Sequence, residues 1–550
     1  MTSRAEATAK ESFPKPRLVT VSPPVFMNGP HSLHTVPQEV LEHIAFFAGT
    51  DSLLGPPSSL VPLLLCNRKI HASLSIEANH HLYAQIFCSK FDTAAPLARL
   101  GSVRLTSWAL AHELRRRCVT LQRLRARLDS TTQARRAEDE DAESTLKMSV
   151  YDVLFTAYIM MLENEEMNKR QLVEYGRMKE WIREFWFDSH GASLAIYYIR
   201  IGQWPVNRPE TALGMWMFWF LLNTGALWRY DVLVESPLNV LKAMALGAHL
   251  YDLTTTPWVE FEPKARRPFE DTILYAKPMD MIPPPLAAPA ILSFLALVNK
   301  RRSIPLPPSD SATQSFHEWD SEWGRCFSKS KRDITDCFEP GSIEGVWEGF
   351  FTYTEFTAYA AMLAGASPTV IQKGVVGRHQ QTWKLREHHL LAFEHSDSDS
   401  GIDMDVDSVT PLRAGDPLRS YFPIGTQIRE HREGLTVQGS GSSQVRRYVR
   451  ASASDSRSNL DEPGPRVQDI IITGEGHSAW GQFNLVGRIR PCDGFISLSK
   501  DYVDGDRGKW LYRGYLIGNT NGNLAGRWRD TLSPADVPGY EGCFVMSRRR

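Results

Sequence analysis

The sequence predicts a multidomain α+β protein in which two helical regions precede an antiparallel β-barrel. The chain has 550 residues, 42% of them hydrophobic, which is enough for several domains with apolar cores. Apolar side chains recur at helical spacing from about Thr35 to Lys300, whereas short β-rich runs between Gly, Asn and Asp turns follow Gly341. We therefore divide the chain into a tail at 1–34, a helical module at 35–92, an all-α middle domain at 93–340 and a β domain at 341–550.

Charge and cysteine usage limit the classes of function. The 62 Lys and Arg residues against 63 Asp and Glu residues give no overall positive field, so we expect no nucleic-acid partner. The seven cysteines are scattered without a C-x-x-C pair, which argues against a disulfide framework or a zinc ribbon. We expect a reduced protein of the cytoplasm, the nucleus or both.

Two segments bear on targeting and membranes. Residues Met1–Pro30 lack the apolar stretch of a signal peptide. The most apolar run, Thr211–Trp228, is barely long enough to span a bilayer and contains Asn223, so a buried helix is the favoured interpretation. We expect no membrane insertion.

The N-terminal module begins with a helix signal. Thr35 and Gln38 have the spacing of a capping box, and Pro37 is tolerated in the first turn. We expect a second helix from about Ser59 and a third element near 79–87. A unit of this size has a small core, so we expect a partner to complete it. The first helix places these residues on one apolar stripe: Val40, Leu41, Ile44 and Phe47.

The run from Val36 to Ile44 (VPQEVLEHI) resembles the opening helix of an F-box. Leu63–Arg68 and Leu82–Phe87 resemble the second helix and the closing segment of that family. The resemblance implies a three-helix F-box that binds the adaptor Skp1 and, through it, cullin-1 and a RING subunit. The alternative is an ordinary helical hairpin packed on the next domain. The implied Skp1-binding residues are Val36, Pro37, Val40, Leu41, Ile44, Phe47, Leu63, Leu64 and Cys66.

A basic amphipathic helix is expected at about Ser107–Leu128. Its arginines include Arg115, Arg116 and Arg117, which suit nucleic acid or anionic lipid. An apolar stripe through Leu114 and Leu121 favours instead a packed helix with a solvated basic face.

The β domain predicts a closed or nearly closed barrel of eight or nine short antiparallel strands. Such a barrel is wide enough to be filled by side chains, or to hold a small ligand or a chain end. Polar inserts at 395–408 and 438–464 are expected to be disordered. The predicted strands are 343–352, 381–391, 427–432, 467–473, 479–490, 494–499, 509–517, 524–529 and 543–548.

The first and last of these strands carry a second resemblance. Gly345-Val346-Trp347 and Arg548 resemble the lipocalin arrangement, in which a first-strand Trp closes one barrel end and a last-strand Arg stacks on it. The module as a whole is similar to the lipocalin-like barrel of some F-box receptors. That resemblance implies that the barrel binds the protein substrate.

Strand arginines and aromatic residues are the candidate substrate contacts. Half of the strand arginines are expected to point inward, where each needs an acidic partner or an anionic ligand. The alternative for each tryptophan is a core position without a ligand. The strand arginines are Arg488, Arg490, Arg513, Arg527 and Arg529, and the candidate substrate-binding residues are Arg488, Trp510, Tyr512, Arg527 and Trp528.

Signals for an enzyme are missing from the sequence. It contains no H-E-x-x-H, P-loop or G-x-S-x-G motif. Glu387-His388-His389 and His395 do not suit one metal, because adjacent residues on a strand face opposite ways. We expect no metal or cofactor and a non-catalytic adaptor: the substrate-recognition subunit of an SCF-type ubiquitin ligase. The alternative is a non-ligase barrel that binds or scaffolds a small ligand or peptide.

Overall fold

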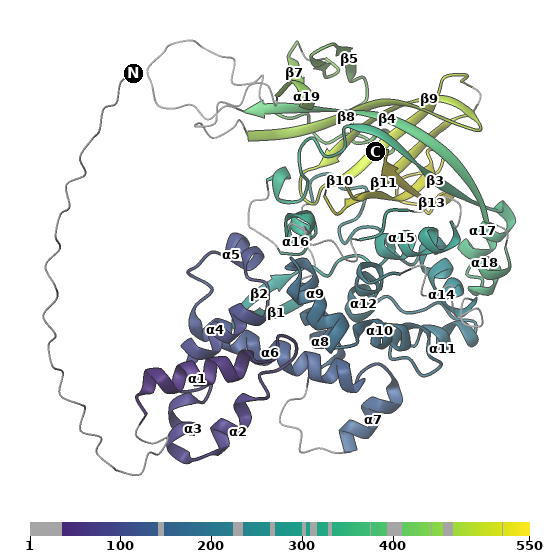
Figure 1. Cartoon of the computed structure of the whole chain (residues 1–550). Helices are drawn as coiled ribbons and strands as arrows, with labels where there is room; N and C mark the ends of the chain where they lie inside the picture. Colours follow the sequence, from purple (N-terminus) through teal and green to yellow (C-terminus); the bar gives the residue numbers. More distant parts are fainter. Residues whose placement is uncertain are drawn as a thin grey trace, which may run out of the picture.

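The computed structural model confirms the α+β class: helices form the N-terminal and middle parts, and a closed antiparallel barrel forms the C-terminal part. The N-terminal helices and the barrel lie at opposite ends of the molecule, with the middle helices between them (Figure 1). The structure describes residues 36–140, 148–223, 235–263, 270–299, 304–307, 316–327, 333–374, 376–392, 410–441, 443–454, 466–505, 507–519 and 521–549.

The N-terminal module contains four helices, not three. Asn67 separates the second from the third, because its side-chain oxygen accepts a hydrogen bond from the Ile70 amide at 2.9 Å and so caps a new helix. Thr35, the first residue of the expected capping box, lies outside the described residues, and Pro37 is the N-cap. The helices are α1 (Gln38–Thr50), α2 (Leu60–Leu65), α3 (Arg68–Leu74) and α4 (His80–Lys90).

The middle region is mainly helical and includes a π-helical turn and two 3₁₀ turns. Its α-helices are α5 (Ala94–Leu100), α6 (Ser107–Ala126), α7 (Thr132–Glu140), α8 (Val150–Leu162), α9 (Met167–Arg170), α10 (Met178–Phe187), α11 (Ala195–Arg200), α12 (Pro209–Phe220), α14 (Glu235–Leu246), α15 (Ala287–Val298) and α16 (Asp320–Cys326). The π-helical turn is Gln171–Tyr175, and the 3₁₀ turns are Phe316–Trp319 and Ile334–Asp336.

Two expectations for this region are corrected. It is not all-α, because β1 (Glu270–Leu274) and β2 (Lys277–Met281) form a hairpin. Its turn is made by Tyr275 and Ala276, whose φ angles are 49° and 56°. A turn with positive φ is usually signalled by Gly or Asn, and the sequence has neither at these two positions. The basic face of α6 is not wholly solvated, since Arg117 and Arg123 are buried in ion pairs with Glu163 and Asp129.

The barrel has eight strands in the order β3-β13-β12-β11-β10-β9-β8-β4, and pairing of β3 with β4 closes it. Two short helices, α17 (Phe356–Leu363) and α18 (Thr369–Lys373), connect β3 to β4. The barrel strands are β3 (Gly345–Thr354), β4 (Val376–Ala392), β8 (Arg466–Ser478), β9 (Gly481–Arg490), β10 (Phe495–Tyr502), β11 (Lys509–Ile517), β12 (Asn523–Asp530) and β13 (Glu541–Arg548).

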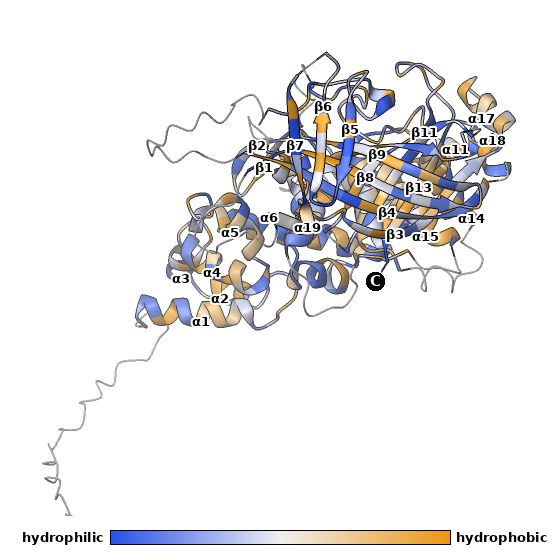
Figure 2. Cartoon of the chain, turned by 90° about the horizontal axis from the view of Figure 1, so that it is seen from above, coloured by the Kyte–Doolittle hydropathy of each residue, from blue (hydrophilic) through white to orange (hydrophobic). Residues whose placement is uncertain are grey.

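Three further strands extend from the second half of β4: β5 (Gln427–His431), β6 (Gly434–Gln438) and β7 (Val445–Arg450). They lie side by side (Figure 2), and β7 pairs with β4 at His388 and His389. A 3₁₀ turn (Pro417–Arg419) precedes them and α19 (Ala451–Ser454) follows. The expected disorder of 438–464 is therefore wrong for β7 and α19, whereas the insert at 395–408 lies outside the described residues.

Alternation along the barrel strands separates two cores. Inward side chains such as Trp383, Phe483 and Leu498 form the barrel core. Outward side chains of β11–β13, among them Tyr515 and Val545, join the core of the helical region, where α15 packs on β12 and β13. This part of the barrel wall is thus buried on both faces.

Candidate functional site

Helix α1 has one buried and one exposed apolar side. Leu41 and Ala45 are buried against the rest of the module. Val40, Ile44 and Phe47 are 47%, 42% and 68% exposed. Apolar side chains gathered on an exposed helix side are typical of a protein-binding surface. We call the exposed large apolar side chains of the first two helices the α1–α2 face: Val40, Ile44, Phe47, Val61 and Leu65.

Helices α1 and α2, which carry the α1–α2 face, lie at the side of the molecule away from the barrel (Figure 2). The face contains three of the nine residues expected to bind Skp1, Val40, Ile44 and Phe47. Of the other six, Pro37 and Cys66 are exposed. Leu41 is buried, and the remaining three are half-buried: Val36, Leu63 and Leu64.

Polar side chains fix this module to the middle region. The Gln171 side chain accepts a hydrogen bond from the Gly55 amide at 2.7 Å and donates to the Leu53 carbonyl at 3.0 Å. The buried Asp92 carboxylate accepts backbone N–H groups at the start of α9, including those of Glu165 and Asn168 at 3.1 and 2.8 Å. These hydrogen bonds hold the N-terminal module, and with it the α1–α2 face, in place against the middle region.

The barrel brings together three of the five expected substrate-binding residues. Trp510, Tyr512 and Trp528 are on the inner side, and the rings of Trp510 and Trp528 are 5.2 Å apart. Tyr512 packs against Trp383 and Phe544 at centroid distances of 5.2 and 5.0 Å. Tyr512 and Trp528 are buried, whereas Trp510 is half-buried at the barrel end that carries the β8–β9 and β10–β11 turns.

The structure does not bring Arg488 and Arg527 to these aromatic residues. The expectation that half of the strand arginines point inward is wrong, because all five alternate with inward side chains and lie outside the barrel. Arg488 forms a buried ion pair with Asp469 at 3.0 Å beneath the β5–β7 extension. Arg527 donates to backbone carbonyls of the helical region, among them that of Ala245 at 3.2 Å.

Sequence reasoning missed a buried amine inside the barrel. Lys500 lies on the inner side of β10 with Ile496 and Leu498 and is 1% exposed. Its Nζ is 3.8 Å from the centre of the Phe483 ring and 3.4 Å from Oε1 of Gln381. Burial lowers the pKa of Lys500 to about 7. The alternation of β10, continued two residues beyond Leu498, is a signal that would have found it.

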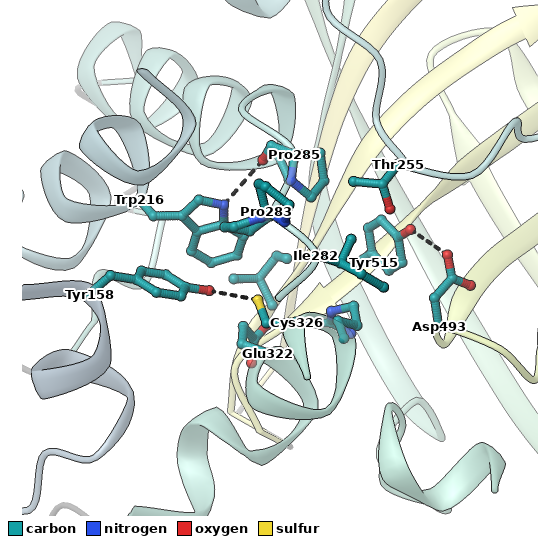
Figure 3. A pocket seen from close by; sticks show the side chains of 14 residues that line it. Tyr158, Trp216, Thr255, Ile282, Pro283, Pro285, Glu322, Cys326, Asp493 and Tyr515 are labelled. Carbon is teal, nitrogen blue, oxygen red and sulfur yellow. Dashed lines mark hydrogen bonds and ion pairs between the residues drawn. The ribbon is translucent and has the colours of Figure 1, made fainter. Parts of the chain in front are cut away.

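A second enclosed place, lined by a cluster of side chains, lies between the helices and the barrel wall (Figure 3). Tyr158 and Cys326 meet there at 3.4 Å, and the Tyr515 hydroxyl donates to Asp493 at 2.8 Å. The cavity at their centre has a volume of about 20 Å³, which fits one water molecule. This place suits a structural water rather than a ligand.

A much larger cavity, of about 390 Å³, lies between the outer wall of β11–β13 and the segment that follows α14. Arg513, Arg527 and Arg529 line it together with His249 and Glu541. Its size is that of a small-molecule site. The sequence predicts that half of the strand arginines point into the barrel, and of these three only Arg527 is a predicted substrate contact, so the sequence does not predict this cavity.

Neither a metal-binding cluster nor a membrane-spanning helix is present among the residues that the structure describes. Those residues contain no group of three or more His, Cys, Asp or Glu side chains arranged to hold a metal ion. Glu387 instead accepts hydrogen bonds from the Gly341 amide and from His389, both at 2.7 Å. His395 lies outside the described residues. Of the helices described, none combines the length and apolarity needed to cross a bilayer.

The fold and these surfaces define an α+β protein with a helical N-terminal and middle region and a closed eight-stranded antiparallel barrel. Comparison of the chain with protein-family models, with curated proteins and with solved structures finds no match.

Proposed function

We propose that this chain is the substrate-recognition subunit of an SCF-type ubiquitin ligase, with an F-box in its N-terminal module and a lipocalin-like barrel for the target. The observation that carries the proposal is the α1–α2 face. Three large apolar side chains of α1 stay in solvent while the opposite side of the same helix supplies the core. Such a helix suits docking of its exposed side onto the adaptor Skp1.

The arrangement of the parts supports the same function. Helices α1 and α2 and the barrel lie at opposite ends of the molecule (Figure 1), so an adaptor at the helices and a target at the barrel would not compete for space. The mechanism is proximity: a target held at the barrel has a raised local concentration near the transfer enzyme carried by cullin-1 and its RING subunit. The chain itself contributes no catalytic group to this scheme.

We further propose that the target meets the barrel end with the β8–β9 and β10–β11 turns. Trp480 and Trp510 are half-buried there, while the barrel interior behind them is filled by aromatic side chains. Half-buried tryptophans offer large apolar contacts at low entropic cost, as protein-binding sites require.

Co-purification of the full-length chain with Skp1 tests the adaptor role. We expect stoichiometric capture by the wild type, and loss of capture by an Ile44→Asp/Phe47→Asp double variant whose melting temperature is unchanged. Gln85→Asp is the control, because it adds a charge of the same sign to an exposed position of α4 and should leave capture intact.

Failure of the folded wild type to capture Skp1 would overturn the ligase proposal. The alternative, a barrel protein that binds or scaffolds a small ligand or peptide outside any ligase, would then be favoured. Equal loss of capture in Gln85→Asp would show that added charge, and not the α1–α2 face, is responsible.

A further inference from the structure

The large cavity on the outer barrel wall contains hydrogen-bonding groups that the protein leaves unused. Nε of Arg513, Nε of Arg527 and Nδ1 of His249 are all buried without a hydrogen-bond partner in the described part of the chain. A buried polar atom without a partner costs free energy, so three around one cavity require an explanation. The two arginine atoms are permanent donors, and the histidine nitrogen becomes one in the appropriate tautomer.

Only one of the three arginines that line the cavity has a carboxylate within ion-pair distance among the described residues. Arg513 forms an ion pair with Glu541 at 3.0 Å. Among the described residues, no carboxylate lies within ion-pair distance of Arg527 or Arg529. Their guanidiniums donate instead to backbone carbonyls: Arg527 to that of Ala245 at 3.2 Å, and Arg529 to that of Pro534 at 3.1 Å. Two further carboxylates line the cavity, Asp252 and Asp536, which both belong to exposed residues. Burial raises the pKa of Asp252, and the charges of Arg527 and Arg513 act against that rise.

The guanidiniums of Arg527 and Arg513 each act on a neighbouring cationic group. Burial and, second, the charge of Arg527 lower the pKa of His249. Burial and, second, the charge of Arg513 lower the pKa of Arg529. Each cationic form is thus disfavoured in part because it adds positive charge beside another guanidinium.

The cavity also has an aromatic wall. The Trp258 ring lies 4.1 Å from the guanidinium carbon of Arg513 and 5.1 Å from that of Arg529. Stacking on one ring orients two guanidiniums and leaves their edges for an acceptor. A volume of about 390 Å³ holds a small organic molecule as well as an inorganic ion.

We infer that this cavity is a binding site for a small oxyanion ligand, a phosphate or a carboxylate group, held by Arg513 and Arg527 with His249 beside them. Guanidinium groups match both kinds of oxyanion through paired N–H donors. An anion here would supply acceptors for the donors that the protein leaves without a partner. The site lies on the outer side of the barrel wall, apart from the α1–α2 face and from the inner side with Trp510, so it does not depend on the proposed ligase function.

Calorimetric titration of the full-length chain tests this inference. The probes are orthophosphate, pyrophosphate, succinate and citrate, at constant ionic strength so that nonspecific screening stays equal. We expect saturable binding of at least one probe, with the phosphate and carboxylate arms identifying the preferred group. We also expect the bound probe to raise the melting temperature.

Three variants make the test specific. Arg513→Gln should weaken the preferred probe at least about tenfold, since it removes one charged fork. Ala248→Trp should do the same by filling the cavity while all three arginines stay, which guards against a fold defect in Arg513→Gln. Arg429→Gln, an exposed arginine of β5, is the matched control and should bind as the wild type does.

Absence of saturable binding by the wild type to all four probes up to millimolar concentration overturns the inference. Binding that survives both Arg513→Gln and Ala248→Trp overturns it too, because the anion would then sit elsewhere. Equal weakening in Arg429→Gln would show a nonspecific charge effect and would also contradict the proposed site.

Discussion

The guanidinium carbon of Arg548, on the last barrel strand, lies 5.4 Å from the centre of the Trp347 ring on the first barrel strand. The two residues are direct partners in the β13–β3 ladder, the pairing that joins the two ends of the barrel domain. Trp347 is fully buried, and its Nε1 donates to the Ile343 carbonyl at 2.8 Å. The contact expected from the first-strand Gly-x-Trp and the terminal arginine is therefore confirmed, and it lies where the first and last barrel strands pair.

Removing the arginine should weaken the packing between the first and last barrel strands. We expect Arg548→Met to lower the free energy of unfolding by about 1 kcal/mol through loss of the cation–π contact. A double-mutant cycle with Trp347→Leu should show a coupling of similar size in urea unfolding. Arg549→Met, at the exposed neighbouring position, is the control: it loses only a surface ion pair with Glu348 at 3.3 Å and should cost less than about 0.5 kcal/mol. A coupling of zero would mean that the two side chains are merely adjacent.

The two sides of α1 should respond differently to the same charge. Leu41→Asp places a carboxylate at a 6% exposed position and should cost several kcal/mol, whereas Ile44→Asp, at 42% exposure, should change stability by less than about 0.5 kcal/mol. Thermal melting and limited proteolysis of the full-length chain measure both. Equal destabilisation would show that the α1–α2 face is packed in solution, against its role as a docking surface.

The buried arginine of α6 should behave as the centre of an ionic cluster. Arg117 is fully buried, with its guanidinium 2.5 Å from Glu163 and 3.0 Å from Glu113. Arg117→Met leaves these carboxylates without a counter-charge and should cost about 3–5 kcal/mol near neutral pH. Burial already raises the pKa of Glu163, and loss of Arg117 should raise it further.

Because the pKa of Glu163 is raised, the stability cost of Arg117→Met should depend on pH. A carboxyl whose folded pKa is raised destabilises the protein when ionised and stops doing so once protonated. The cost of Arg117→Met should therefore shrink as pH falls through the raised pKa of Glu163, and Glu163→Gln in the same chain should relieve part of it. Urea unfolding at neutral and mildly acidic pH measures this. A cost independent of pH and unrelieved by Glu163→Gln would contradict the cluster.

Strand alternation predicted how the barrel side chains divide, but not what covers each side. The sequence correctly puts Trp510 and Tyr512 on one side of β11 and Arg513 on the other. In a barrel whose outer side faces water, buried arginines would have to point inward. Here the helices bury the outer side of β11–β13 as well, so Arg513 and Arg527 are buried outside the barrel. Local pattern carries no information on such a second covering layer.

The candidate sites also differ in how far the sequence predicts them. The stripe of Val40, Ile44 and Phe47 follows from helical spacing, which also groups the buried Leu41 with it and so does not separate core from surface. The Arg513 cavity depends on the approach of residues 248–259 to a barrel wall more than 250 positions later. No spacing rule reaches that far along a chain, so only the tertiary structure reveals this cavity.

The buried amine of Lys500 should make barrel stability depend on pH. Burial lowers its pKa from the ordinary 10.5 to about 7, and no carboxylate among the described residues forms an ion pair with it. Between these values the unfolded chain binds a proton that the folded chain lacks, so stability rises with pH, and the full penalty applies below about pH 7.

Lys500→Met removes the charge and keeps the length of the side chain. The gain in unfolding free energy over the wild type should be greatest, a few kcal/mol, below about pH 7 and should fall toward zero as pH approaches 10.5. Urea unfolding across this range measures the difference between the two proteins. Lys384→Met, at an exposed lysine on the outer side of β4, is the matched control and should give a flat difference. A flat difference for Lys500→Met as well would mean that the amine stays charged inside the barrel, stabilised by the surrounding aromatic rings and Gln381.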